Sequence, residues 1–210
     1  MKLIIFGSTG GTGRQLIAQA LQQKHQVTAF ARNPDKLIQT HPNLNVIKGD
    51  VLDPGAVQRA IQGQEVVLCS LGMPNIMDRS KLRTKGTKNI VDAMLKSSVT
   101  RLICQSGLGA GDSRDLLPFH YKYVIAPLFM RALYADHNKQ EEIITESTLE
   151  WTIVRPGSLT NGDLTASYHQ GYNIKNKPDT IKISRADTAD FMLKQLNNTQ
   201  YLHRTPCLSY

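Results

Sequence analysis

The sequence has few of the features that mark secreted, zinc-binding or membrane-spanning proteins. It contains three cysteines, Cys69, Cys104 and Cys207, and no CxxC pair or Cys/His cluster. We therefore expect no disulfide framework and no bound metal. No apolar run approaches the roughly 18 residues of a membrane span. The first run, residues 3–6, is too short for the core of a signal peptide, so we expect a cytoplasmic protein.

Blocks of like charge are also absent, although the formal net charge is +8. Such a charge suggests a nucleic-acid-binding role as one alternative. Because the Lys and Arg residues are scattered, we favour a basic surface that attracts small anionic ligands. We expect neither nucleic acid nor a membrane as a partner. A length of 210 residues suits one domain, 1–210, which is large enough to bury a full core.

The chain alternates short apolar runs with segments of helical periodicity. This pattern predicts strands over 2–6, 26–31, 43–48, 65–70, 101–105 and 151–154, and a short one near Leu208. It predicts helices over 12–23, from Pro54, over 80–96, over 119–146 with an interruption at Pro127, and from a Ser184 cap to Leu196. Repeated strand–helix–strand units indicate the α/β class: a doubly wound parallel sheet, the Rossmann fold, with helices on both faces. Ligands bind such sheets beyond the carboxyl ends of the strands.

A glycine-rich segment follows the first predicted strand and leads into the first helix. It reads Gly7-Ser8-Thr9-Gly10-Gly11-Thr12-Gly13. Gly7 allows a tight turn, Gly10 lets the backbone approach a pyrophosphate, and Gly13 lets the helix pack close to the sheet. The helix start, with Gly11, offers N–H groups to phosphates, and Thr9 and Thr12 add hydroxyl donors. A plain turn is the alternative, but the flanking strand and helix favour a dinucleotide site.

The end of the second strand carries a base where NAD-specific sites usually carry an acid. Arg32 can hold a 2′-phosphate through forked, charge-assisted hydrogen bonds, and Lys36 adds a second charge. A solvated surface cation is the alternative for Arg32. We therefore predict NADPH/NADP as the cofactor.

The ends of the third and fourth strands supply further candidates for cofactor binding. Asp50 can accept from the adenine amino group while Val51 packs on the ring, although a turn-forming Asp is the alternative. Leu71 and Gly72 can let the cofactor cross the sheet edge, and a simple loop glycine would look the same.

These residues together resemble a known family. The glycine-rich segment, Arg32, residues 49–51 and residues 152–157 are similar to the atypical short-chain dehydrogenase/reductases with an NmrA-like Rossmann fold. Within that family they most resemble the group of biliverdin reductase B, the NADPH-dependent flavin reductases. The resemblance covers nearly the whole chain, including residues 87–91 and 136–137. It implies a monomer that transfers hydride from NADPH to a planar acceptor such as a flavin, a biliverdin-type linear tetrapyrrole or a quinone.

The resemblance also implies two catalytic residues. Ser106 matches the active-site serine, which can orient the acceptor or relay a proton; a loop-capping serine is the alternative. His137 matches a histidine that faces the cofactor cleft, and it can donate a proton because histidine titrates near neutrality. A hydrogen-bonded structural histidine is the alternative.

We expect segments near 107–118 and 159–177 to form a substrate wall. Four aromatic residues can stack on a planar ring or pack in a helix core: Phe119, Tyr121, Tyr123 and Phe129.

The sequence departs from the family's pattern at three positions. Conventional members use a Tyr-x-x-x-Lys pair, and the corresponding positions here hold Leu133 and His137. The missing acid argues against an alcohol substrate and agrees with flavin-type reduction. It also leaves a second function possible, that of a non-catalytic NADP(H)-sensing or scaffold protein. A second active-site histidine of the family appears here as Ser158, which puts a proton role at that position in doubt.

Overall fold

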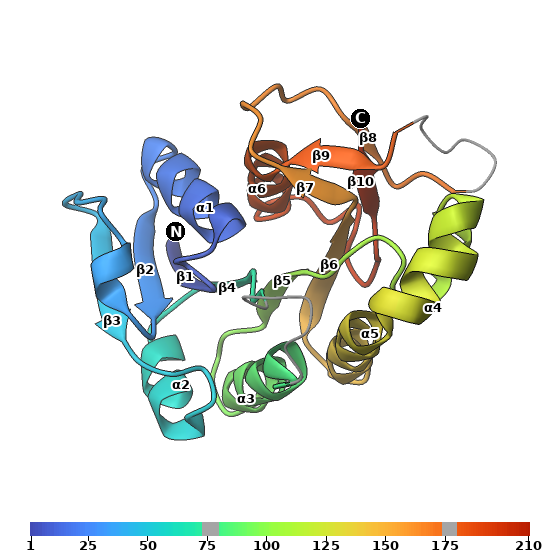
Figure 1. Cartoon of the computed structure of the whole chain (residues 1–210). Coiled ribbons are helices and arrows are strands. Elements are labelled where there is room, and N and C mark those ends of the chain that lie inside the picture. Colours follow the sequence, from blue (N-terminus) through green and yellow to red (C-terminus); the bar gives the residue numbers. More distant parts are fainter. Residues whose placement is uncertain (73–79, 174–179) are drawn as a thin grey trace.

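A computed structural model of the chain describes residues 1–72, 80–173 and 180–210 (Figure 1). In these residues, eight strands form one sheet in the order β3-β2-β1-β4-β5-β6-β10-β8. The strands are β1 (Lys2–Phe6), β2 (Gln26–Ala31), β3 (Leu44–Lys48), β4 (Val66–Cys69), β5 (Arg101–Gln105), β6 (Glu150–Pro156), β8 (His169–Gln170) and β10 (Cys207–Ser209). Neighbours are parallel except β8 and β10. A separate parallel pair joins β7 (Ser158–Thr160) and β9 (Lys182–Ser184).

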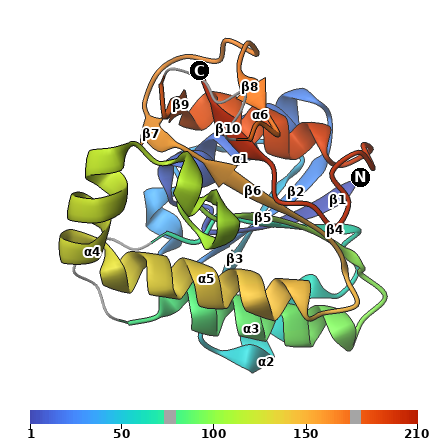
Figure 2. The same ribbon diagram turned by 90° about the vertical axis from the view of Figure 1, so that its right-hand side faces the viewer.

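Helices cover both faces of the sheet (Figures 1 and 2). One face carries α1 (Gly11–Gln22) and α6 (Arg185–Lys194), and the other carries α2 (Pro54–Ile61), α3 (Leu82–Leu95) and α5 (Arg131–Thr145). The shorter elements are η1 (Pro34–Lys36), η2 (Gly111–Leu116), η3 (Tyr121–Ile125) and α4 (Ala126–Phe129). This arrangement confirms the predicted doubly wound parallel sheet. Within the described ranges, no helix combines the length and apolar character needed to cross a bilayer.

Strand β1 shows how one apolar run builds two cores. Leu3 and Ile5 pack with the residues of α1 and α6, whereas Ile4 and Phe6 pack with those of α2, α3 and α5. All four side chains are fully buried. A strand in the middle of a parallel sheet is covered on both faces, so it needs apolar residues at successive positions. Burying each such side chain contributes about 1.5–3 kcal/mol relative to leaving it exposed.

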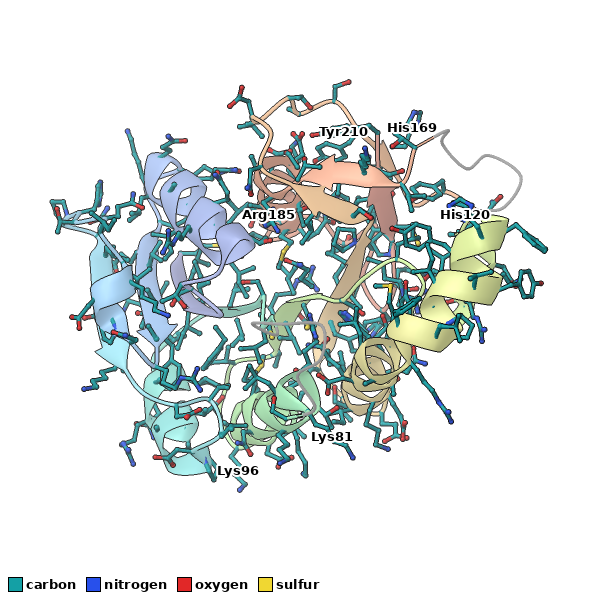
Figure 3. All side chains as sticks on the ribbon, in the orientation of Figure 1. Lys81, Lys96, His120, His169, Arg185 and Tyr210 are labelled. Atoms are coloured by element: carbon teal, nitrogen blue, oxygen red, sulfur yellow. The ribbon has the colours of Figure 1, made fainter. Side chains whose placement is uncertain are left out.

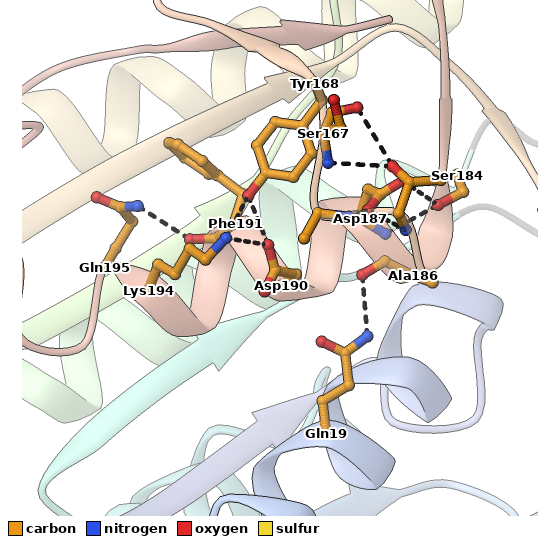
Figure 4. A network of polar contacts seen from close by, with 12 residues as sticks. Gln19, Ser167, Tyr168, Ser184, Ala186, Asp187, Asp190, Phe191, Lys194 and Gln195 are labelled. Carbon is orange, nitrogen blue, oxygen red and sulfur yellow. Dashed lines mark hydrogen bonds and ion pairs between the residues drawn. The ribbon is translucent and has the colours of Figure 1, made fainter. Parts of the chain in front are cut away.

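Polar contacts join α6 to α1 (Figure 4) and also to the last residue, Tyr210. Gln19 Nε2 donates to the carbonyl oxygen of Ala186 at 2.9 Å, and both residues are buried. Ser184 Oγ accepts from the Asp187 amide at 2.8 Å, which confirms the predicted cap of α6. The Tyr210 hydroxyl donates to the Asp187 carboxylate at 2.6 Å. These bonds fix the first turn of α6 against the rest of the fold.

The segment over 119–146 differs from the prediction, because the helix does not break at Pro127. The π-helical turn η3 runs directly into α4, and the interruption falls at Met130, which has φ −116°. At the end of η3 the Ala126 amide bonds to the Tyr121 carbonyl, a wider ring than an α-turn. Pro127 lies in the first turn of α4, directly after this wider turn, where its missing N–H is tolerated.

Candidate functional site

A cleft of about 830 Å³ opens at the carboxyl ends of the central strands. It lies where the strand order reverses between β1 and β4, the place at which open α/β sheets bind ligands. Its wall contains the predicted site residues Gly7, Thr9, Gly10, Gly11, Thr12, Arg32, Lys36, Asp50, Val51, Leu71, Gly72, Ser106 and His137. The fold therefore brings together residues that are spread over more than half of the sequence.

At Gly7 and Gly13, neighbouring backbone atoms leave no room for a side chain. Gly7 has φ +81°, and a Cβ on it would lie 2.4 Å from the Ser70 carbonyl oxygen. A Cβ on Gly13 would lie 2.2 Å from the Gly7 carbonyl oxygen. Gly13 therefore has its predicted packing role, but it lies behind the loop and does not line the cleft as a direct cofactor contact would. Gly13 does not line the cleft because its Cα faces the backbone of the loop.

The N-terminus of α1 differs from those of α2, α3 and α6, which side chains cap; α5, which follows α4 after Met130, also has no side-chain cap. The N-cap of α1 is Gly10, and no side chain caps it. By contrast, α2 is capped by the side chain of Asp53, α6 by that of Ser184, and α3 by the carboxylate of Asp136, which comes from α5. Amide groups at a helix start need acceptors, and the dipole there favours an anion. The start of α1 lies in the cleft, so it can bind phosphate.

The end of β2 gives the cleft a cationic rim. Arg32 is exposed and lines the cleft, and it takes part in none of the ion pairs within the described ranges. Lys36 also lines the cleft, and Arg14 Nη2 donates to its carbonyl oxygen at 2.9 Å, which fixes η1. The nearby carboxylate of Asp35 is not part of the wall. The segment after β2 therefore contributes two cationic residues, and not its own acid, to the wall of the cleft.

Asp50 forms a turn, as the alternative interpretation of this residue predicted. Its Oδ1 accepts from the Leu52 amide at 2.9 Å. The same residue lines the cleft beside Val51, whose carbonyl oxygen accepts from Asn89 Nδ2 at 2.9 Å. Because a carboxylate has a second oxygen, forming the turn does not exclude accepting from adenine, and that contact stays a prediction.

Ser106 and His137 meet at the other end of the cleft. The Ser106 Oγ lies 3.1 Å from His137 Nδ1, and both residues are buried. Burial and then the charge of Arg83 lower the pKa of His137 to about 3. This lowered pKa disagrees with the expectation that the histidine titrates near neutrality, because its surroundings penalise the imidazolium, whereas a catalytic role for His137 stays a prediction. As a neutral ring it fixes the orientation of the Ser106 hydroxyl.

Two carboxylates fix α5, the helix that carries His137. Asp136 Oδ1 accepts from the Thr84 amide at 3.0 Å, which joins α5 to the start of α3. Glu141 binds the guanidinium of Arg155 on β6 through both oxygens, at 3.0 and 2.7 Å. Glu141 and Arg155 are both buried, and a bidentate pair of this kind is directional. The position of His137 is therefore set from two sides.

Three of the four aromatic residues do not lie where the sequence predicted. Of the four predicted to stack on a ring or pack in a core, only Tyr121 lines the cleft. Phe119, Tyr123 and Phe129 are 76%, 55% and 69% exposed. Tyr134 lines the cleft instead, and its spacing of three residues from His137 on one helix was the signal that could have identified it. Other cleft residues that the sequence did not indicate are Arg83, Gln105 and Arg185.

A Rossmann fold with an uncapped first helix in its cleft defines a dinucleotide-binding protein. Residues 7–199 match the NAD(P)H-binding family, and the chain belongs to that family. The fold and the family together identify a protein that binds NAD(P)H.

Several known proteins are similar to this chain. An uncharacterised chloroplast protein of Arabidopsis thaliana is 30% identical over 79% of this chain. The structure of ChuY, an anaerobilin reductase of Escherichia coli O157:H7, has a TM-score of 0.80 and 22% identity and covers 99% of this chain and 96% of its own. A short-chain dehydrogenase/reductase of Veillonella parvula in complex with NADP has a TM-score of 0.81 and 19% identity, covering 99% and 94%. The chain spans 62%, 34% and 41% of three plant relatives that it matches.

Proposed function

We propose that the protein is an NADPH-dependent reductase that transfers a hydride to a planar acceptor. The observation that carries the proposal is a continuous cleft that joins the glycine loop to the Ser106–His137 pair. A dinucleotide with its phosphates at the start of α1 can extend its nicotinamide towards Ser106. Hydride transfer requires this nicotinamide to lie against the acceptor in a fixed geometry.

The preference for NADPH over NADH rests on the rim at the end of β2. Arg32 and Lys36 line it, whereas Asp35, the acid nearest in sequence, does not. A guanidinium matches a phosphate through two parallel N–H···O bonds, and the ribose hydroxyl of NADH cannot form the same charged pair. The rim therefore supports a 2′-phosphate site.

The acceptor end of the cleft supports a substrate that needs little acid assistance. The positions of the missing Tyr and Lys hold Leu133 and His137, and both line the cleft. With a neutral histidine there, the acceptor must be electron-poor enough to take a hydride on its own. Flavins, linear tetrapyrroles and quinones have this property, as expected for an enzyme of the biliverdin reductase B type. The fold shared with an anaerobilin reductase favours the tetrapyrrole.

The proposed substrate wall combines a glycine-containing loop and a C-terminal segment. From 107–118, Gly107, Leu108 and Leu117 line the cleft, and from 159–177 Leu159 does. Residues 174–177 of the second segment lie outside the described residues. Tyr121 and Tyr134 add aromatic surface on the α5 side. Apolar walls of this kind suit a planar ring. They also exclude water from the path of the hydride.

A second candidate function is an NADP(H) sensor without turnover. The pKa of His137, lowered to about 3, and the missing Tyr–Lys pair favour it, since neither supplies a proton at neutral pH. Monomeric state, a cytoplasmic location and independence from nucleic acid and membranes remain predictions for either function.

A screen for NADPH oxidation separates these two functions. Purified protein is mixed with NADPH and, in turn, FMN, FAD, riboflavin, biliverdin and small quinones. A reductase consumes NADPH with at least one acceptor, and the Ser106→Ala variant does so more slowly. Tight NADPH binding without oxidation by any of these acceptors would instead support the sensor and reject the reductase.

A further inference from the structure

Arg185 is a cleft residue to which neither the sequence pattern nor the family match gives a role. It is the first residue of α6, directly after the Ser184 cap. Its side chain lines the same cleft as the glycine loop, although the two are far apart in the sequence. Figure 3 shows Arg185 between α1 and the β7–α6 region. The fold therefore places a guanidinium next to the start of α1.

The contact with Gly11 shows how close this guanidinium lies to the phosphate-binding turn. A Cβ on Gly11 would lie 2.4 Å from Cδ and 2.7 Å from Nε of Arg185. Any other residue at position 11 would displace the arginine. The arginine, which crosses the first turn of α1, therefore explains why position 11 holds a glycine.

Neutral groups hold Arg185 in place. Its Nη1 donates to Asn161 Oδ1 at 2.7 Å and, more weakly, to the Leu159 carbonyl oxygen at 3.4 Å. Among the ion pairs of the described ranges, none includes Arg185. The side chain is thus fixed without its charge being neutralised. A fixed guanidinium loses little conformational entropy when it binds an anion.

We infer that Arg185 binds the diphosphate of the dinucleotide together with the amides at the start of α1, which lie beside it. Two sources of positive potential, the uncapped helix start and the guanidinium, lie next to each other in the cleft. An anion between them interacts favourably with both, and the diphosphate is the anion of NAD(P)H that this turn binds. Arg185 then recognises NADH and NADPH equally, whereas Arg32 recognises only the 2′-phosphate.

Titration of three ligands into the full chain tests this assignment. NADPH carries both the diphosphate and the 2′-phosphate, NADH carries the diphosphate alone, and adenosine 2′-monophosphate carries the 2′-phosphate alone. The Arg185→Gln variant should weaken NADPH and NADH about tenfold to a hundredfold, the range for hydrogen bonds to charged groups, and leave adenosine 2′-monophosphate unchanged. Arg32→Ala should weaken the binding of NADPH and adenosine 2′-monophosphate and leave NADH binding unchanged. Arg185→Lys should fall between Arg185→Gln and the wild type.

A matched control removes a different charge from the same helix. Lys194, at the far end of α6, forms an ion pair with Asp190, and Lys194→Gln should leave all three affinities unchanged. Wild-type affinity of Arg185→Gln for NADPH and NADH would overturn the assignment, as would an equal loss for adenosine 2′-monophosphate. If Arg185→Gln does not fold, the comparison of Arg185→Lys with wild type decides. The readout is cofactor binding, so failure to find an acceptor leaves this test intact.

Discussion

The protonation state of His137 gives a prediction whose size follows from the structure. The pKa of this residue is about 3 in the folded protein, against 6.5 for an unperturbed histidine. At a pH between these two pKa values, His137 binds a proton in the unfolded chain but not in the folded chain. Stability therefore falls as the pH decreases from 6.5 towards 3, by about 1.4 kcal/mol per pH unit. Between pH 7 and pH 5 this amounts to about 2 kcal/mol.

Urea unfolding of wild type and His137→Gln at both pH values measures this term. Other groups, including His25, titrate in both proteins and cancel in the difference. The free energy of unfolding of the wild type should decrease by about 2 kcal/mol more than that of His137→Gln. An equal decrease in both proteins, or a His137 NMR titration centred near pH 6.5, would refute the reasoning and restore the histidine as a possible proton donor.

Three further substitutions test separate parts of the site. Gly13→Ala should lower both the melting temperature and NADPH affinity, because its Cβ would lie 2.2 Å from the Gly7 carbonyl oxygen; unchanged values of both would contradict the packing role. Arg32→Ala should cost about 2 kcal/mol, or about thirtyfold, in NADPH binding and leave NADH binding unchanged; equal losses in calorimetric titration would reject the 2′-phosphate contact. Ser106→Ala should lower kcat by about tenfold or more at unchanged NADPH affinity; loss of affinity instead would assign Ser106 to cofactor binding.

The sequence predicts those parts of the fold whose signals are local. The apolar run of β1 and the glycines after it lie together in the chain, so strand, loop and helix could be recognised. The Ser184 cap of α6 was recognised for the same reason. The pair β7–β9 and strand β8 were missed, because two- or three-residue strands show no periodicity and pair with partners distant in the sequence.

The candidate site shows the same division. Arg32 could be assigned because its place at the end of a strand determines where it lies. Arg185 could not be assigned, since only tertiary packing brings it over Gly11. His137 was located correctly, but its pKa depends on burial and on Arg83, which comes from a different helix. Protonation states are properties of packing, which local patterns do not encode.

The central claim is that NADP⁺ lies along this cleft, with its diphosphate at the start of α1. A crystal structure of the protein soaked in NADP⁺ tests it most directly. We predict the diphosphate at the Gly11 and Thr12 amides, the 2′-phosphate on Arg32, and the nicotinamide beside Ser106. Density for NADP⁺ elsewhere on the protein, or a nicotinamide that points away from Ser106, would contradict the account.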